Sequence, residues 1–420
     1  MVAPVAELAV TVNLVYGVTM NIETSSTPSA PVRRRRHPIV VVATVLWVLL
    51  AAFVLVCMLL PTMPNTTLFS VSVLAYTYNP FLLVLVALGG LLLFLAWRRR
   101  LRILSVVSGV LTLALLVSVV VPTIRLAQTA AENDVALSVP QLFEGPRGGL
   151  SEPTATTTYN TVDGEDLQMD VWRPADQQLA ARSALVYVYG GGYESGNRTQ
   201  WASFFQHLTS QGITVFSMDY RLSTPTDPSW DKAAGDVKCA VGWVHQNAAR
   251  YGIDSDRIAI SGGSAGGSLA TLAAYSADSD AIPASCDVDD TSVRAVVDFY
   301  GPSDLANLYA GTPSTPVRGS LEQYLGGTPQ TQPERYRDYS SITYVDENSP
   351  ATLIIQGLRD TGVQSEESTN LASALEAAGV ENELLLLPDT EHAFDAAFGG
   401  FANQISQARI TEFLHEHLIN

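Results

Sequence analysis

The ten residues IAISGGSAGG, from Ile258 to Gly267, determine how the rest of this sequence is interpreted. An apolar stretch typical of a β-strand runs directly into Gly-x-Ser-x-Gly, and a helix-forming sequence follows. A sharp strand-to-helix turn would place Ser264 at its tip, with glycine needed at Gly262 and Gly266, where a Cβ atom would collide with a neighbouring strand or helix. The pattern is short enough to arise by chance in a chain rich in Gly and Ser, so the surrounding sequence must support it. The stretch predicts a nucleophilic serine.

From residue 155 onward, apolar strand-like stretches alternate with amphipathic helical patterns. Continuous apolar stretches such as ALVYVY and ATLIIQ are typical of strands buried on both faces of a parallel sheet. The expected strands are at residues 167–172, 184–189, 214–219, 257–261, 295–300, 352–356 and 383–387. The expected helices are at residues 200–211, 230–251, 264–277, 365–378 and 401–417. The predicted fold class is therefore α/β, with a mostly parallel, doubly wound sheet that carries helices on both faces.

A serine hydroxyl is a poor nucleophile at neutral pH, so a base must take its proton and a third group must orient that base. Asp360, in LIIQGLRDTGV, follows one expected strand, and His392, in LLLPDTEHAF, follows the next. In doubly wound sheets, residues at the carboxyl ends of the strands face the ligand. Taken singly, Asp360 could instead cap the following helix, and Glu391 beside His392 is expected to point elsewhere. The chain order Ser264, Asp360, His392 is that of an α/β-hydrolase triad, so these three residues are predicted to be catalytic.

The stretch VYGGGYESG, at residues 188–196, follows another expected strand with three consecutive glycines. Acyl transfer places negative charge on the carbonyl oxygen, and backbone N–H groups must already point toward it. Glycines let the main chain approach a ligand closely, although a plain turn is the other interpretation of this stretch. In the functional interpretation, Gly191 and Gly192 donate to the oxyanion together with Ala265, the residue after the nucleophile.

The two parts of the 420-residue chain differ in charge. Residues 1–121 contain eight Arg against two Glu, a net charge of +6, whereas the remainder contains 16 basic against 39 acidic residues, a net charge of −23. Nucleic-acid phosphates require clustered Lys and Arg, so binding of nucleic acid is not expected. The acidity of the second part is interpreted as favouring solubility.

Three uncharged apolar runs, at residues 39–60, 80–97 and 103–121, contain 22, 18 and 19 residues. As helices they would be roughly 33, 27 and 28 Å long, close to the ~30 Å hydrocarbon core of a bilayer. A secretory signal peptide has a shorter apolar core and would not explain two further runs. Buried helices of a globular core are the other alternative. We predict three transmembrane helices, which make the lipid bilayer a partner of residues 39–121.

Arginine clusters predict the orientation of these helices. RRRR at residues 33–36 precedes the first run, and RRRLR at residues 98–102 separates the second from the third, whereas residues 61–79 contain no Lys or Arg. Cytoplasmic loops carry an excess of Lys and Arg. The amino terminus is therefore expected in the cytoplasm, and everything after residue 121 is expected on the extracytoplasmic side of the cell membrane.

The same patterns suggest domain boundaries. Residues 1–38 have no clear pattern and are expected to form a disordered cytoplasmic N-terminus, with Met1 or Met20 as the true start. The other expected parts are a three-helix transmembrane region at 39–121, a linker at 122–154, and a catalytic domain at 155–420 with a cap segment at 302–350.

Cysteine usage is compatible with an extracytoplasmic catalytic domain. Cys57 lies inside the first apolar run, whereas Cys239 and Cys286 are the two cysteines after it. Oxidising conditions would permit a disulfide bond between Cys239 and Cys286. Two unpaired buried thiols remain the alternative, and a Cα separation above about 7 Å would exclude the bond.

Six short motifs, YGGGY, DYRL, GGSAGG, YGPSDL, QGLRD and EHAF, carry a resemblance to a known family. Together they resemble the α/β-hydrolase esterases of the hormone-sensitive-lipase and carboxylesterase type, especially the feruloyl-esterase-like branch. The resemblance covers about residues 155–420. It implies carboxylic-ester hydrolysis through an acyl-enzyme, a serine triad and an HGGG-type oxyanion loop, without metal or cofactor. It implies nothing about the three apolar runs.

Two positions depart from that family pattern. Tyr189 stands where the HGGG motif usually has His, so the side-chain contacts that brace the loop must differ. Gly263 precedes the nucleophile where related branches often have Asp or Glu, which removes a side chain near the site. The second departure is expected to affect substrate choice more than mechanism.

The function expected from the sequence is that of a membrane-anchored serine esterase or deacylase. Its substrate would be an extracytoplasmic ester, either attached to the cell envelope or a small molecule. A serine peptidase or an acyltransferase on the same fold is an alternative, as is a non-catalytic binding module on a membrane anchor. Loss of a triad member would favour the binding module, but all three residues are present.

Overall fold

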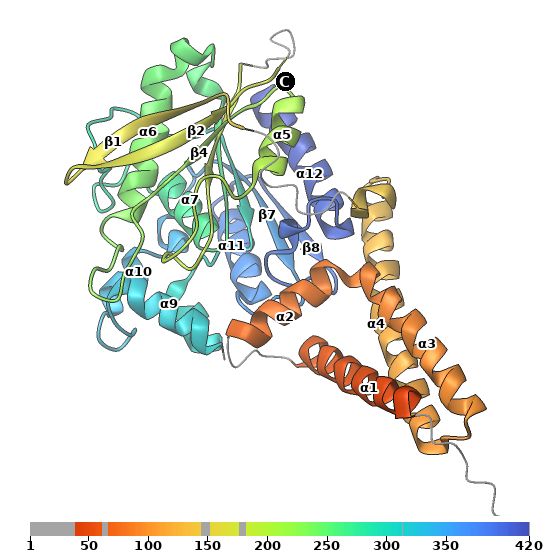
Figure 1. Ribbon diagram of the computed structural model, residues 1–420. Helices are drawn as coiled ribbons and strands as arrows, with labels where there is room; N and C mark the ends of the chain where they lie inside the picture. The colour runs from red at the N-terminus through yellow and green to blue at the C-terminus, as the bar shows by residue number, and fades with distance from the viewer. Residues whose placement is uncertain (1–37, 61–65, 144–151, 176–181, 313, 420) are drawn as a thin grey trace, which may run out of the picture.

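The computed structural model describes residues 38–60, 66–143, 152–175, 182–312 and 314–419. Within them, eight strands form one sheet in the order β1-β2-β4-β3-β5-β6-β7-β8 (Figure 1). β2 pairs antiparallel with β1 and with β4, and all other neighbouring strands are parallel. The strands are β1 (Ala155–Val162), β2 (Glu165–Trp172), β3 (Ala184–Val188), β4 (Thr214–Met218), β5 (Ile258–Gly263), β6 (Ala295–Phe299), β7 (Ala351–Gly357) and β8 (Asn382–Leu387). The prediction of a mostly parallel sheet is confirmed.

Helices cover both faces of this sheet. They are α5 (Ala202–Ser210), α6 (Ala233–Tyr251), α7 (Ala265–Tyr275), α11 (Ser365–Ala377) and α12 (Phe401–Leu418). On one face, Tyr187 of β3 packs edge-on against Phe205 of α5, with ring centroids 5.0 Å apart. On the other face, Phe216 of β4 packs against Trp243 of α6. Because both faces are covered, every residue of β3, β4, β5 and β6 is buried, which explains their continuous apolar sequences.

The predicted cap segment consists of short helices. They are α8 (Leu305–Gly311), α9 (Thr315–Leu325), α10 (Pro333–Asp338) and the 3₁₀ turn η4 (Ser341–Tyr344). Each is at most three turns long, so the sequence shows no sustained helical period there. Tyr324 at the end of α9 stacks on Tyr193 of the glycine-rich loop, with ring centroids 3.9 Å apart. This contact holds the cap against the loop that follows β3.

Three helices in the described N-terminal region are long and apolar enough to cross a membrane. They are α1 (Pro38–Leu59), the segment of η1 (Asn79–Leu82) and α3 (Leu83–Arg98), and α4 (Arg102–Glu132). Trp47 of α1 donates its indole N–H to the carbonyl of Leu85, 3.1 Å away. Its ring lies against Gly89 of α3, where a Cβ atom would be only 2.4 Å from it. The absence of a side chain at Gly89 thus allows α1 to pack closely on α3.

The linker predicted at residues 122–154 is wrong in its first part, because α4 continues to Glu132. Pro122 lies inside this helix and lacks the N–H group that would bond to the carbonyl of Ser118. The side-chain amide of Asn79 donates to that carbonyl instead, at 2.9 Å. A contact from another segment therefore compensates for the proline and lets the helix continue.

Strand β1 and helix α1 begin near two other predicted boundaries. β1 begins at Ala155, where the predicted catalytic domain starts, although the sequence analysis assigned no strand there. Residues 1–37 of the predicted disordered N-terminus lie outside the described residues, as do the arginines at 33–36. Pro38 is the first residue of α1 rather than the last residue of that N-terminal segment.

A helix that the sequence analysis did not predict, α2 (Thr66–Thr77), follows α1. Figure 1 shows it between α1 and the sheet-bearing domain. Arg359, two residues after β7, donates to the carbonyls of Met58 and Leu60 at the end of α1, the second at 3.1 Å. The hydroxyl of Tyr76 on α2 also donates to the carbonyl of Met58, at 2.7 Å. These contacts join the end of α1, helix α2 and the carboxyl edge of the sheet.

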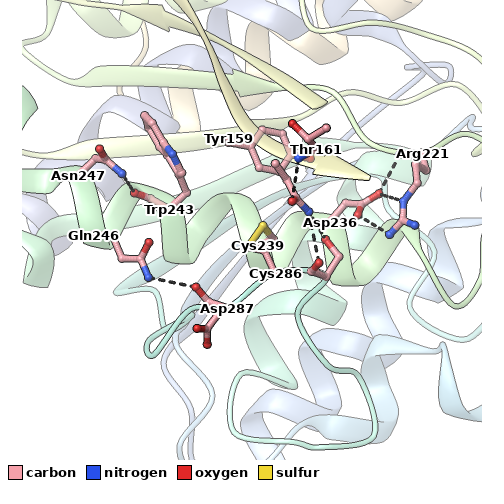
Figure 2. The surroundings of a disulfide bond; sticks show 12 residues. Tyr159, Thr161, Arg221, Asp236, Cys239, Trp243, Gln246, Asn247, Cys286 and Asp287 are labelled. Carbon is pink, nitrogen blue, oxygen red and sulfur yellow. Dashed lines mark hydrogen bonds and ion pairs between the residues drawn. A yellow bond between two sulfur atoms is a disulfide. The ribbon is translucent and has the colours of Figure 1, made fainter. Parts of the chain in front are cut away.

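Cys239 on α6 and Cys286 in the loop before β6 form a disulfide bond, with their Cα atoms 5.4 Å apart (Figure 2). The sequence left open a disulfide bond or two unpaired buried thiols, and the structure contains the disulfide bond. The side-chain amide of Gln246 donates to the carbonyl of Asp287 at 3.2 Å, so the same loop is attached to α6 at two positions. Cys57 is a buried free thiol in α1.

Candidate active site

Ser264 lies at the tip of the turn between β5 and α7. Its φ and ψ angles are 56° and −124°, a strained conformation for a residue with a side chain. A Cβ atom at Gly262 would lie 2.3 Å from the carbonyl oxygen of Gly266, and one at Gly266 would lie 2.2 Å from that of Val188. Both glycines are therefore required by the close packing that holds the turn, as the sequence predicted. The turn presents the Ser264 side chain to a cavity.

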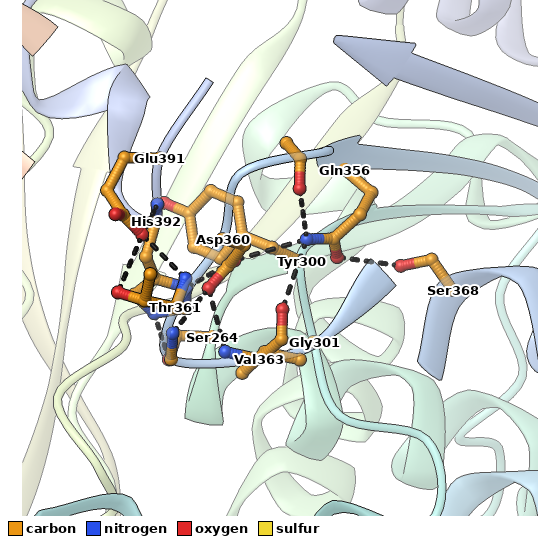
Figure 3. A network of polar contacts seen from close by, with 12 residues as sticks. Ser264, Tyr300, Gly301, Gln356, Asp360, Thr361, Val363, Ser368, Glu391 and His392 are labelled. Carbon is orange, nitrogen blue, oxygen red and sulfur yellow. Dashed lines mark hydrogen bonds and ion pairs between the residues drawn. The ribbon is translucent and has the colours of Figure 1, made fainter. Parts of the chain in front are cut away.

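The structure brings the three residues predicted to be catalytic together (Figure 3). The Nε2 atom of His392 lies 2.9 Å from the Oγ atom of Ser264, and its Nδ1 atom lies 2.7 Å from the Oδ2 atom of Asp360. Asp360 follows β7 and His392 follows β8, so neighbouring parallel strands carry both to the edge of the sheet where Ser264 lies. Hydroxyl, imidazole and carboxylate form a continuous chain of hydrogen bonds, which suits proton transfer from serine to histidine.

The side chain of Asp360 is completely buried and both of its oxygens accept hydrogen bonds. Its Oδ1 atom accepts the backbone N–H groups of Gly362 and Val363, at 2.8 and 2.7 Å. The side-chain amide of Gln356 donates to Oδ2 at 3.1 Å, and Ser368 in turn donates to the carbonyl oxygen of that amide at 2.8 Å. Figure 3 shows this network extending from Ser368 to the carboxylate. It holds Asp360 in the orientation in which it contacts the imidazole.

The surroundings of His392 favour its charged form. Burial on its own would lower the pKa of His392, but the charge and hydrogen bond of Asp360 outweigh burial, and this pKa is raised. The carboxylates of Glu391 and Asp395 act in the same direction. The ring of Tyr300 lies 4.6 Å from the imidazole, centroid to centroid, and its hydroxyl donates to Asp395, whose pKa burial raises to about 6. The site therefore stabilises the imidazolium that forms when serine gives up its proton.

Glu391, which the sequence analysis left out of the site, belongs to its supporting structure. Its Oε1 atom accepts the backbone N–H of Thr361 at 2.7 Å and that of His392 at 3.0 Å (Figure 3). Its Oε2 atom accepts the hydroxyl of Ser72 on α2, at 2.9 Å. Burial, followed by the charge of Asp360, raises the pKa of this carboxyl. Glu391 thus connects the loop after β7, the loop after β8 and helix α2.

The predicted oxyanion donors border the same cavity as Ser264. Gly191 and Gly192 have φ angles of 137° and 62°, which residues with a Cβ atom rarely adopt. A Cβ atom at Gly190 would lie 2.4 Å from the carbonyl oxygen of Gly263, so the glycine-rich loop packs directly on the nucleophile turn. Ala265 is the first residue of α7, and the N-terminus of a helix favours negative charge. Their roles as donors remain a prediction.

The two departures from the family pattern have structural consequences. Tyr189 stacks on Tyr220, with ring centroids 4.5 Å apart, and the hydroxyl of Tyr220 donates to the carbonyl of Tyr189 at 3.0 Å. The ring of Tyr189 also lies 2.5 Å from where a Cβ atom of Gly196 would be. Packing of aromatic rings therefore braces the loop where a histidine usually stands. A Cβ atom at Gly263 would lie 3.3 Å from the hydroxyl of Tyr300, so Tyr300 occupies space that a larger residue would need.

A cavity of about 720 Å³ opens over the Ser264 hydroxyl. Its walls come from the glycine-rich loop (residues 190–195), from the cap around α9, and from Phe69 on α2. Apolar walls with a few converging polar groups are typical of small-molecule sites. No group of three or more His, Cys, Asp or Glu side chains suited to hold a metal ion occurs in the part of the chain that the structure describes. The apolar lining residues include Phe69, Trp201, Val317 and Leu321.

Several residues of this site were not predicted from the sequence. Phe69 and Ser72 lie in α2, a 12-residue helix that is too short to span a membrane. The only sequence feature noted for this segment, residues 61–79, was the absence of Lys and Arg. Tyr300 and Gln356 stand inside the motifs YGPSDL and QGLRD, so the family motifs contained a signal for them. Glu391 stands in the motif EHAF, but its supporting role could not be predicted from that motif, because its partners come from three separate segments.

Comparisons with known proteins identify esterases as similar to this chain. The sequence profile of the BD-FAE family matches residues 169–375, which include Ser264 and Asp360. Esterase LipQ of Mycobacterium tuberculosis is 32% identical over 289 residues, covering 68% of this chain and 67% of LipQ. Esterase LipC of the same organism is 32% identical over 260 residues, covering 57% of this chain and 63% of LipC. The solved structure of Thermogutta terrifontis esterase 2 is similar with a TM-score of 0.53 and 28% identity, over 62% of this chain and 91% of that one.

Proposed function

The chain belongs to the α/β-hydrolase serine esterases of the hormone-sensitive-lipase and feruloyl-esterase type, and we propose that it is a membrane-anchored esterase that acts through an acyl-enzyme on extracytoplasmic esters. Carboxylic-ester hydrolysis is the activity of this family. The observation that carries the proposed mechanism is the hydrogen-bonded chain from Ser264 through His392 to Asp360 beneath a largely apolar cavity.

In the proposed reaction, His392 takes the proton of Ser264 as the Oγ atom attacks the carbonyl carbon of the ester. The carbonyl oxygen becomes negatively charged, and the backbone N–H groups of Gly191, Gly192 and Ala265 stabilise it. The bond to the alcohol oxygen then breaks, and His392 donates its proton to that oxygen. A water molecule that gives a proton to His392 attacks the acyl-enzyme, and the acid is released as the serine is regenerated.

Asp360 acts through His392 in this scheme. Its carboxylate accepts the Nδ1–H of the imidazole, which leaves Nε2 without a proton and directed at the serine. The same carboxylate stabilises the imidazolium that forms during attack, and for the same reason it raises the pKa of His392. The structure of Thermogutta terrifontis esterase 2 phosphorylated by paraoxon supports a nucleophile in the corresponding fold.

The membrane anchor is proposed from the three long apolar helices α1, α3 and α4. Arg98, Arg99, Arg100 and Arg102 lie at the turn between α3 and α4, at the far end of these helices from the hydrolase domain (Figure 1). Because cytoplasmic loops are rich in Lys and Arg, this turn is proposed to lie in the cytoplasm and the hydrolase domain outside it. The net charge of −23 on residues 122–420 suits an aqueous compartment on either side of the membrane.

A fluorophosphonate probe tests the proposed nucleophile in the full-length protein in membranes. The wild type should be labelled and should hydrolyse p-nitrophenyl acetate, whereas Ser264→Ala should do neither. A p-nitroanilide of similar acyl length distinguishes esterase from peptidase activity, and it should be cleaved far more slowly than the ester. The proposal fails if the wild type is not labelled, or if Ser264→Ala is labelled equally.

A further inference from the structure

Helix α2 contacts the catalytic loops although it lies between two proposed membrane helices. The hydroxyl of Ser72 donates to the buried carboxylate of Glu391, which in turn accepts the backbone N–H groups of Thr361 and His392. Arg359, the residue before Asp360, lies with its guanidinium 5.4 Å from the ring centroid of Tyr76 on α2. The helix is therefore attached to both loops that carry the acid and the base of the triad.

Phe69, one turn before Ser72, extends from α2 into the active-site cavity. Its ring lies 6.0 Å from the imidazole of His392, centroid to centroid, at an angle of 48°. A Cβ atom at Gly362 would lie 3.4 Å from the ring of Phe69 and 3.4 Å from the ring of His392. These are ordinary van der Waals distances, so Gly362 borders both rings. Phe69 and His392 line the same side of the cavity.

The position of His392 indicates whether the side of the cavity beside Phe69 receives the acyl part or the alcohol part of the ester. When the acyl-enzyme forms, the bond between the carbonyl carbon and the alcohol oxygen breaks, and the imidazole gives its proton to that oxygen. The alcohol must therefore leave past the imidazole, where Phe69 lies. We propose that α2 forms a wall of the alcohol subsite and that Phe69 is a specificity-determining residue that limits the size of the alcohol part of the ester.

This inference rests on the proposed ester hydrolysis at Ser264 and adds a part of the substrate site to it. The family resemblance in sequence covers residues 155–420, so α2 lies outside it. The aromatic ring favours an apolar alcohol part. The hydroxyl of Tyr76 attaches α2 to the end of α1, so the helix that forms this wall is joined directly to the proposed membrane anchor.

Two series of substrates separate the two halves of the ester in the full-length protein in detergent. One series keeps acetate and varies the alcohol from ethyl to a bulky aryl group, and the other keeps ethanol and lengthens the acyl chain. The variants are Phe69→Ala and Phe69→Trp. The matched control is Leu74→Ala, on the same helix but 56% exposed and not part of the cavity lining. The ratio of kcat/KM between two esters does not depend on the active fraction, so partial loss of folded protein does not affect it.

Phe69→Ala should raise kcat/KM for the bulky acetate relative to ethyl acetate by about tenfold, and Phe69→Trp should lower this ratio. The kcat/KM ratios within the acyl series should change less than twofold in both Phe69 variants. Leu74→Ala should change the ratios of neither the alcohol series nor the acyl series. Alcohol ratios within twofold of wild type in both Phe69 variants, or equal shifts in the two series, would overturn the inference while leaving ester hydrolysis intact. If the wild type hydrolyses neither series and Ser264 is not labelled by fluorophosphonate, the proposed function fails and the inference fails with it.

Discussion

The Nε2 atom of His392 lies 2.9 Å from the Oγ atom of Ser264, although 128 positions separate the two residues in the chain. The distance is that of a direct hydrogen bond, so the imidazole can accept the serine proton without a rearrangement of either loop. The contact depends on β5 and β8 ending at the same edge of one sheet. It also depends on Asp360 and Glu391, which hold the imidazole and its backbone in place.

The role of Asp360 can be tested with Asp360→Asn. The amide cannot hold the imidazole in the tautomer with an unprotonated Nε2 atom, so we expect kcat for p-nitrophenyl acetate to fall by about 10⁴-fold. Asp346→Asn is a matched control, because Asp346 is exposed and does not line the cavity above Ser264. A decrease of less than tenfold in Asp360→Asn would contradict the assigned role.

The raised pKa of His392 predicts the position of the acid limb of the pH profile. Protonated imidazole cannot accept the serine proton, so kcat/KM should fall as pH decreases through this pKa. Half of the plateau value should therefore be reached above about pH 6.5, the ordinary pKa of histidine. Glu391→Gln removes one of the charges that raise the pKa of His392, and its acid limb should move to lower pH. An acid limb below pH 6 in the wild type would be inconsistent with the geometry of the site.

Ser72→Ala tests whether α2 stabilises the catalytic loops. The change leaves the Oε2 atom of the buried Glu391 without its hydroxyl donor, which should lower the free energy of unfolding by about 1–3 kcal/mol. Thermal unfolding of the full-length protein in detergent measures the effect. Ser373→Ala, which removes an exposed hydroxyl on α11, should leave the midpoint nearly unchanged. Equal midpoints for the two variants would mean that the contact with Glu391 contributes little.

The disulfide bond between Cys239 and Cys286 closes a loop with a sequence separation of 47. Replacing both cysteines by serine should lower the free energy of unfolding by about 2–4 kcal/mol, mainly because the unfolded chain gains freedom. Denaturant unfolding with and without a reductant measures this difference. The reductant should shift the wild type toward the double variant and should not affect the double variant itself. A wild type that is insensitive to a reductant able to reach the bond would contradict the prediction.

The proposed topology predicts which reagents reach the site in intact cells. A charged fluorophosphonate that does not cross membranes should label Ser264 without permeabilisation. A cysteine introduced by Arg100→Cys, in the turn between α3 and α4, should react with a charged maleimide only after permeabilisation. The reverse pattern would place the hydrolase domain in the cytoplasm. It would leave the triad unaffected and would change the class of accessible esters.

Local patterns were sufficient to predict seven of the eight described strands and the nucleophile turn. Strands buried on both faces have continuous apolar sequences, so β3, β5, β6, β7 and β8 could be located before any contact was known. Gly262 and Gly266 are required by a turn that is defined within ten residues. Asp360 and His392 could be associated with Ser264 because parallel strands end at a common edge, which is a property of the topology rather than of particular side chains.

The supporting contacts could not be predicted in this way. The hydrogen bond between Ser72 and Glu391 joins residues 319 positions apart, and although Glu391 begins the motif EHAF, Ser72 lies in none of the motifs. The continuation of α4 past Pro122 depends on the amide of Asn79, which lies in η1 at the start of the segment before α4. A proline normally ends a helix, so the sequence around Pro122 predicts that the helix stops there. The hydrogen bond from Asn79, in a different segment, is what allows it to continue.

The sequence by itself therefore determined the fold class, the three apolar runs and the three candidate catalytic residues, because each rests on a local pattern or on the order of strands. Only the tertiary structure decided that Phe69 and Ser72 of α2 border the active site, and that Glu391 connects the loops of Asp360 and His392. These relationships arise from packing between segments that are distant in the chain. Packing of this kind is set by the shapes and hydrogen-bonding groups of both partners together, and neither segment contains that information alone.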